Sequence, residues 1–137
     1  MYAGCPIVSK SQLQTEIALS TTEAKYTGLS YALREVIPLM ELLKEMKEKR
    51  FNFLDHKLKV HCRVFEDNSG AIEMAVVNKW RPRTKHLATK LHHFRSYVNY
   101  GKISVHKIDT SLQPEYVLTK PLNSDLIQRH RKTIMGW

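Results

Sequence analysis

The sequence predicts an α/β domain in which helices cover a sheet, because segments with strand patterns and segments with helix patterns alternate along the chain. Residues 14–20 (QTEIALS) alternate polar and apolar side chains, as a half-buried strand does. Residues 57–65 (KLKVHCRVF) and 102–108 (KISVHKI) show the same alternation. No glycine-rich phosphate-binding motif follows any of these strands, which argues against a nucleotide-binding doubly wound sheet.

The longest predicted element is a helix that begins after Ser20. Apolar residues recur there at helical spacing, and Ser20 with Glu23 has the spacing of a capping box. Pro38 lies inside this pattern, so we expect a kink or a break near residues 36–37, since proline lacks the N–H that a helix needs. Further helical segments are predicted over residues 69–77 and 86–99, as a single turn in 113–119, and from Asn123 or Ser124 to a C-cap at Gly136.

The chain length of 137 residues predicts one domain, residues 1–137, that can form a core without disulfides. The two cysteines, Cys5 and Cys62, show neither a CxxC pair nor zinc-type spacing. This favours reduced intracellular thiols, with a single bridge between them as the alternative. No apolar run approaches the ~20 residues that span a membrane, and the amino terminus lacks a signal-peptide pattern, so we expect a soluble intracellular protein without a membrane partner.

The charge pattern predicts an anionic partner. The sequence has 22 Lys and Arg against 13 Asp and Glu, a formal net charge of +9. No acidic residue occurs between Met74 and Ile108, while acids collect in residues 35–48. Nucleic acid is the expected partner, with a solvated charged surface as the alternative. The residues predicted to contact phosphates lie in and after a basic loop: Lys79, Arg81, Arg83, Lys85, His86 and Lys90.

Two carboxylates are candidates for a metal site. Glu23 is predicted in the first turn of the long helix, and Asp67 at the carboxyl end of a strand, where sheets commonly present functional residues. Each also has a structural explanation, since Glu23 completes the capping box and Asp67 with Asn68 suits a helix cap. The histidines fit no zinc spacing and no Ser or Cys lies in a nucleophile motif, so zinc and nucleophilic catalysis are not expected.

Five motifs give the chain a family resemblance. The segments SKSQLQTEIALSTTEAKY, VFEDNSGAIEMA, RPRTKHL, LHHFRSYV and TKPL occur in this order from about Ser9 onward. This order resembles the ribonuclease H domain that ends the Pol polyprotein of copia-type LTR retrotransposons. The resemblance implies a ribonuclease H-like fold, with a mixed sheet flanked by helices, and hydrolysis of the RNA strand of an RNA–DNA hybrid. It also implies two Mg²⁺ ions held by four carboxylates.

The resemblance assigns two of these four carboxylates. Glu23 matches the second and Asp67 the third, so both are expected to be catalytic residues and Mg²⁺ ligands. The first has no counterpart, because the earliest aspartate of the chain is Asp55. The chain is therefore expected to be truncated at its amino terminus and to lack the first, central strand of the fold.

The fourth carboxylate position is occupied by Tyr116, so the resemblance implies a lost catalytic residue there. A neutral phenol is a poor Mg²⁺ ligand. Glu115 is adjacent, but a shift of one residue turns a helical side chain by ~100°, and Asp109 is a weaker substitute. Lys25, where the family often has a second acid, adds a positive charge close to Glu23 and is expected to disfavour Mg²⁺.

These departures predict a ribonuclease H domain by descent that is inactive or very weak alone. It would be an enzyme if an upstream reverse transcriptase polypeptide supplied the first strand and its aspartate. The alternatives are a non-catalytic basic module that binds an RNA–DNA hybrid or duplex, and a retired fragment used in protein interaction. Loss of the central strand also predicts destabilisation or self-association through the gap. The expected location is cytoplasmic, in virus-like particles, or nuclear.

Overall fold

The computed structural model of this chain describes residues 7–8, 10–15, 17–49, 59–77, 92–118 and 120–135. Contacts within the chain define two units. The central unit comprises residues 18–107, and the terminal unit comprises residues 1–17 together with residues 108–137. The single domain that the chain length predicts stays a prediction.

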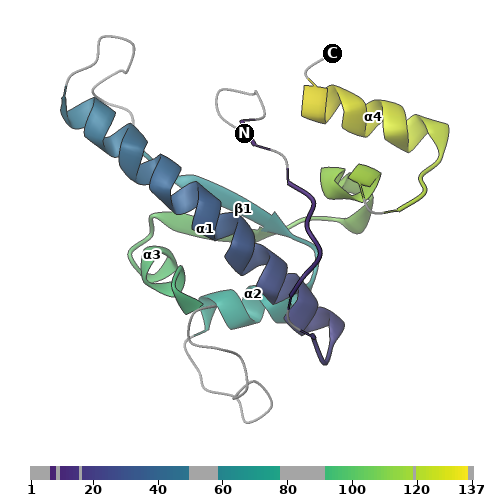
Figure 1. The fold of residues 1–137 in the computed structure, drawn as a ribbon, viewed down its shortest axis with the longest axis horizontal. Helices are drawn as coiled ribbons and strands as arrows, with labels where there is room; N and C mark the ends of the chain where they lie inside the picture. The colour runs from purple at the N-terminus through teal and green to yellow at the C-terminus, as the bar shows by residue number, and fades with distance from the viewer. Residues whose placement is uncertain are drawn as a thin grey trace. The chain divides into compact units, whose positions relative to one another are not determined.

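The central unit begins with the long helix α1 (Thr21–Glu48), which crosses the two strands in Figure 1. Ser20 is its N-cap, and the Ser20 hydroxyl accepts a hydrogen bond from the Glu23 N–H at 3.2 Å. The Glu23 carboxylate in turn accepts a hydrogen bond from the Leu19 N–H at 2.9 Å. This reciprocal arrangement confirms the predicted capping interaction between Ser20 and Glu23, with the return bond made one residue before the cap.

Pro38 lies inside α1 without ending it, so of the kink or break expected near residues 36–37 the break is wrong, and the kink stays a prediction. Pro38 and Arg34, whose carbonyl loses its N–H partner to the proline, are both exposed, and water can satisfy that carbonyl. Leu33 and Met40 lie on either side of Pro38 and are both buried. Packing on both sides of the proline therefore outweighs its local effect on the helix.

The sheet of the central unit consists of two parallel strands, β1 (Cys62–Glu66) and β2 (Ile103–Lys107). Cys62 pairs with Ile103 and Glu66 with Lys107, so the carboxyl ends of both strands lie at the same edge. Parallel strands need a crossover connection. Here the connection includes α2 (Ser69–Val76) and α3 (Arg95–Asn99), which confirm parts of the helices predicted over residues 69–77 and 86–99.

The core of the central unit lies where α1, α2, the start of α3 and the sheet meet. Its buried apolar side chains are Tyr26, Leu29, Leu33, Met40, Ala71, Met74, Ala75, Phe94 and Ile103. The starts of α1 and α2 approach so closely that a Cβ at Gly70 would lie 2.9 Å from Thr22 Cγ2. A side chain at position 70 would therefore force Thr22 or one of the two helix starts to shift.

The strand expected at residues 14–20 is wrong for the part of it that the structure describes, because residues 14, 15 and 17–20 are not in a strand. Ile17 and Leu19, which the alternation placed on a buried face, are 94% and 75% exposed. A strand needs a hydrogen-bonded partner, and β1 and β2 pair with each other in a two-stranded sheet. The fold is thus mixed α/β, as predicted, whereas the sheet formed by the described residues is parallel and small rather than mixed.

The terminal unit contains two short 3₁₀ helices, η3 (Thr110–Leu112) and η4 (Pro114–Leu118), and the helix α4 (Ser124–Met135). η4 confirms the single turn predicted in residues 113–119. Asn123 accepts a hydrogen bond from the Leu126 N–H at 3.0 Å, which confirms the predicted start of α4, while Gly136 lies outside the described residues. No helix in the described part of the chain combines the length and apolar character needed to cross a membrane.

Candidate functional site

The candidate site lies at the carboxyl end of β1, where the chain turns into α2. Asn68 is the N-cap of α2, and its side-chain oxygen accepts hydrogen bonds from the Ala71 N–H at 3.0 Å and from the Thr22 hydroxyl at 3.3 Å. Of the two residues that the sequence offered as a cap, Asn68 performs this role. The carboxylate of Asp67 is consequently not the group that caps α2.

Asp67 forms an ion pair with Lys25 from the first turns of α1. The Lys25 ammonium lies 3.2 Å from Asp67 Oδ1, and the side chains are 24% and 9% exposed, respectively. A charge pair that is largely removed from water is screened much less than a surface pair. Lys25 therefore places a positive charge against one of the two carboxylates that the sequence marks as metal ligands.

Glu66, the last residue of β1, was not among the predicted site residues. It is 6% exposed, and its carboxylate accepts hydrogen bonds from the Asp67 N–H at 3.0 Å and the Asn68 N–H at 3.1 Å. Burial raises the pKa of Glu66 to about 7; the Asn68 N–H opposes this rise, Asp67 adds to it, and the charge of Lys25 opposes it. The signal that could have found Glu66 is the pair of consecutive acids that ends an alternating strand.

Glu23 is buried, at 8% exposed, and its carboxylate binds the Leu19 N–H at the start of α1. Two positions apart on a helix are turned by about 200°, so Glu23 and Lys25 leave α1 in different directions. Lys25, and not Glu23, is the α1 residue that lies beside the Asp67 carboxylate in an ion pair. The metal-ligand and catalytic roles of Glu23 and Asp67 stay predictions.

The described residues do not fit a divalent cation at this site. They contain no group of three or more His, Cys, Asp or Glu side chains that could hold a metal ion. Mg²⁺ would have to bind Asp67 beside an ammonium that already lies at contact distance, and like charges at that separation repel strongly. The positive charge beside Asp67 in this structure is that of Lys25, and the Mg²⁺ that the resemblance implies stays a prediction.

The remaining predicted site residues fall into two groups. The basic residues Lys79, Arg81, Arg83, Lys85, His86 and Lys90 lie outside the described residues. Tyr116, in the terminal unit, is buried in η4, with the Lys120 ammonium 3.9 Å from its ring centroid. Of its suggested substitutes, Asp109 caps η3 through the Ser111 N–H and hydroxyl, both at 3.0 Å, and Glu115 is exposed. The terminal unit thus offers local structural roles for Tyr116 and Asp109.

A second polar contact stabilises the junction between α1 and the segment before α3. The hydroxyl of Tyr26, which is fully buried, lies 2.6 Å from His92 Nδ1. Burial raises the pKa of Tyr26 and lowers that of His92, with Arg95 contributing to the lowering for His92. Both pKa shifts favour the neutral forms, in which the Tyr26 hydroxyl donates a hydrogen bond to His92 Nδ1. We interpret this hydrogen bond as structural.

Comparison with known proteins identifies relatives of the chain. The chain is homologous to a segment of retrovirus-related Pol polyproteins of plant transposons. It is 32% identical over 119 residues, 87% of the chain, to the Pol polyprotein from transposon TNT 1-94 of Nicotiana tabacum. It is 30% and 29% identical, over 94% of the chain, to the Pol polyproteins from transposons RE2 and RE1 of Arabidopsis thaliana.

The chain spans 8% of the length of each of these polyproteins. No protein-family model matches the sequence. No solved structure matches the fold. The similarity to the three Pol polyproteins confirms the retrotransposon Pol origin that the five motifs predict. The ribonuclease H assignment within Pol stays a prediction.

Proposed function

We propose that this chain is the ribonuclease H-like region of a retrotransposon Pol polyprotein and that, with the present residues, it binds nucleic acid without cleaving it. The homology to Pol polyproteins and the ordered motifs support the first part. The Lys25–Asp67 ion pair carries the second part, because it sets a positive charge against the carboxylate that Mg²⁺ would need. In two-metal nucleases such ions activate the attacking water and stabilise the leaving oxygen.

The site residues supply no substitute for that chemistry. The Asp67 carboxylate is paired with Lys25, and Glu66 titrates near pH 7 with two backbone N–H groups bound to its oxygen. The hydrogen bonds to Glu66 and the ion pair of Asp67 with Lys25 both lie at the turn between β1 and α2. Glu66, Asp67 and Lys25 thus have structural contacts at the carboxyl end of β1, where the family resemblance implies a catalytic residue.

Nucleic-acid binding is proposed from the charge of the chain. The net charge of +9 and the acid-free stretch between Met74 and Ile108 favour phosphate contacts without sequence preference. Affinity for a hybrid or duplex should fall by roughly one log unit per log unit of salt for each phosphate neutralised. Replacing Arg81, Arg83 and Lys85 with alanine should flatten this dependence, and an unchanged slope would exclude this stretch.

The test is incubation of the purified chain with an end-labelled RNA–DNA hybrid in Mg²⁺ and in Mn²⁺, beside a Glu23→Gln/Asp67→Asn double variant. We expect no cleavage by either protein and salt-sensitive retention of the hybrid by both. Cleavage that is lost in the double variant would overturn the non-catalytic assignment. Absence of binding at low salt would overturn the nucleic-acid role and favour a fragment used in protein interaction.

A further inference from the structure

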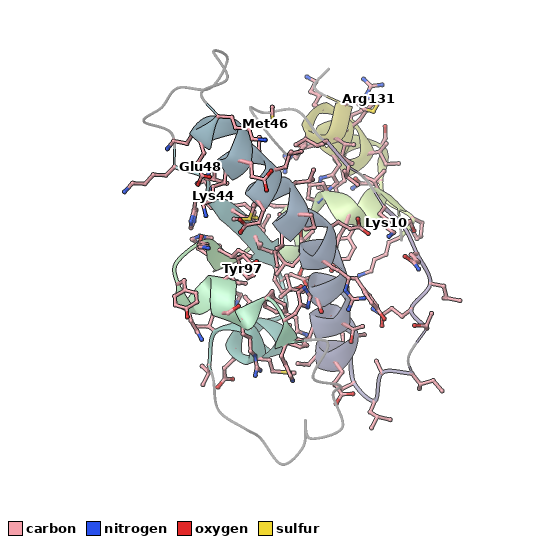
Figure 2. All side chains as sticks on the ribbon, turned by 60° about the vertical axis from the view of Figure 1, so that its left-hand side comes forward. Lys10, Lys44, Met46, Glu48, Tyr97 and Arg131 are labelled. Carbon is pink, nitrogen blue, oxygen red and sulfur yellow. The ribbon has the colours of Figure 1, made fainter. Side chains whose placement is uncertain are left out.

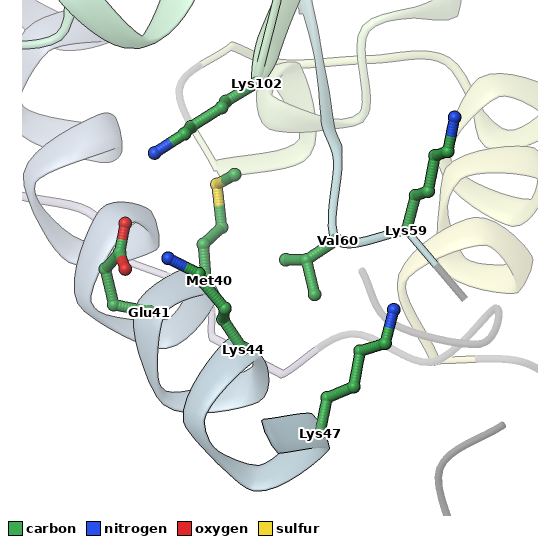
Figure 3. A pocket seen from close by; sticks show the side chains of 7 residues that line it. All are labelled: Met40, Glu41, Lys44, Lys47, Lys59, Val60 and Lys102. Atoms are coloured by element: carbon green, nitrogen blue, oxygen red, sulfur yellow. The ribbon is translucent and has the colours of Figure 1, made fainter. Parts of the chain in front are cut away.

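A lysine-lined pocket lies at the opposite end of the β1–β2 sheet from Asp67. Its volume is about 310 Å³, and it lies between the last turns of α1 and the segments that lead into β1 and β2 (Figure 3). The lining residues are Met40, Glu41, Lys44, Lys47, Lys59, Val60 and Lys102. Five strand residues at about 3.3 Å each separate it from the end of β1, so this pocket is distinct from the candidate site.

The floor of the lysine pocket is apolar and its walls are cationic. Met40 is 7% exposed and Val60 is half-buried, and both belong to or pack against the core. Lysine side chains commonly cover such a floor with their stems while the ammonium groups stay in water. Four lysines and one glutamate, Glu41, line the hollow, so its lining residues carry a formal excess of three positive charges. Figure 3 shows Lys44 and Lys102 on the same side of Val60 as Glu41, with Lys47 and Lys59 on the other side.

The lysines come from three separate segments, so the excess of charge is a product of the fold. Lys44 and Lys47 are on α1, whose last turns are seen in Figure 2, while Lys59 precedes β1 and Lys102 precedes β2. Bringing like charges together costs free energy, which salt or a bound anion relieves. A fold that assembles them around a pocket is therefore set up to gain from binding an anion.

The position of Lys102 is fixed by its surroundings. Its carbonyl accepts a hydrogen bond from the Cys62 N–H at 3.1 Å, and its N–H donates to the Tyr97 carbonyl at 2.9 Å. Gly101 precedes it with φ 66°, a conformation that glycine adopts readily and that turns the chain from α3 into β2. The Lys102 ammonium also lies 5.3 Å from the Tyr97 ring centroid, a cation–π contact. These backbone contacts set the point at which the exposed Lys102 side chain leaves the chain, at the edge of the pocket.

We propose that the lysine pocket binds an anion carrying two or more linked phosphate groups. Three segments present charge from different sides, which suits several phosphate oxygens better than a single small anion. The source is either a free oligophosphate or consecutive phosphates of a nucleic-acid backbone, since both present the same chemistry. This pocket is separate from the basic stretch at residues 79–90. With a free oligophosphate as the source the inference goes beyond the proposed function, whereas with nucleic acid as the source it rests on it.

The test is titration calorimetry of the full chain with pyrophosphate, tripolyphosphate, sulfate and a short single-stranded oligonucleotide, at low ionic strength. The test variant is Lys44→Gln/Lys102→Gln. The matched control is Lys107→Gln/Lys132→Gln, which removes the same charge from the far end of β2 and from α4. The Lys102→Arg variant keeps the charge at this position and should still bind the phosphate probes. It is the variant to measure if the double variant does not fold.

We expect pyrophosphate and tripolyphosphate to bind more tightly than sulfate, and binding to weaken at least about tenfold in the test variant but less than about threefold in the control. Glu41→Gln should tighten binding a few-fold, since it removes the one opposing charge. Loss of oligonucleotide binding in the same test variant would identify nucleic acid as the source, and its retention would identify a free oligophosphate. Equal weakening in both double variants, or no binding of any phosphate probe, would overturn the proposal.

Discussion

Replacing Lys25 with methionine tests how strongly the Lys25–Asp67 pair contributes to the fold. The substitution keeps the apolar stem and removes the charge. At 3.2 Å the gross Coulomb energy of this pair is about 5 kcal/mol for an effective dielectric constant of about 20, and about 1.3 kcal/mol in bulk water. Asp67 is 9% and Lys25 24% exposed, so the pair lies between these limits and desolvation offsets part of the gain. We expect a coupling free energy of about 1–3 kcal/mol.

The assay is a double-mutant cycle measured by urea unfolding. It compares the parent chain, Lys25→Met, Asp67→Asn and the double variant, with Lys49→Met as a control because Lys49 is an exposed residue at the end of α1. Each single variant at the pair should lower the free energy of unfolding, and the double variant should lose less than the sum. The control should change it by less than about 0.5 kcal/mol.

A coupling free energy below about 0.5 kcal/mol would refute this reasoning, because it would show an ion pair no stronger than an ordinary surface pair. A strong fall of the coupling with added salt would refute it as well, since a largely buried pair is weakly screened. Either result would also remove the physical basis for excluding Mg²⁺ from Asp67. The hybrid-cleavage experiment would then have to carry the functional assignment alone.

Three further changes test the surroundings of this pair. Lys25→Glu should create a site at which Mn²⁺ binds Asp67, raising the melting temperature by about 3–5 °C at millimolar metal, whereas the parent chain should not respond. Glu66→Gln should flatten the pH dependence of stability: the folded-state pKa of about 7 lies above the ordinary 4.5, so the free energy of unfolding falls as pH rises between these values. Tyr26→Phe should cost about 1 kcal/mol by removing the hydrogen bond to His92, measured by urea unfolding.

Matched variants separate these effects from general damage. An equal Mn²⁺ response of the parent chain and Lys25→Glu would contradict the first prediction. Glu115→Gln, at an exposed acid, should leave the pH slope in place, and a Glu66→Gln variant with the parental slope would contradict the second. Tyr100→Phe, at a tyrosine that is 79% exposed, should cost nothing, and an equal cost at both tyrosines would contradict the third.

Local chemistry in the sequence predicted the starts of α1, α2 and α4, but not that of α3, which begins at Arg95 without a side-chain cap. Residue type and spacing identified the Ser20–Glu23 pair, and they narrowed the other two caps to Asp67 or Asn68 and to Asn123 or Ser124, because a cap satisfies backbone groups within four residues of itself. The structure selects Asn68 and Asn123. The two parallel strands were recognisable from alternation. The Pol origin followed from the order of short motifs, and it was confirmed by the comparison with transposon polyproteins.

Tertiary structure decided which residues meet. Residues 14–20 alternate like a strand, yet the described part of them pairs with no other strand, since a strand depends on a partner that the local sequence does not supply. Local sequence does not supply the contact of Lys25 with Asp67 either, nor the burial that raises the pKa of Glu66, because both depend on how α1, β1 and α2 pack. The lysine pocket joins three segments far apart in sequence. Caps are set by nearest neighbours along the chain, whereas charge pairs, burial and pockets depend on which distant segments the core brings together.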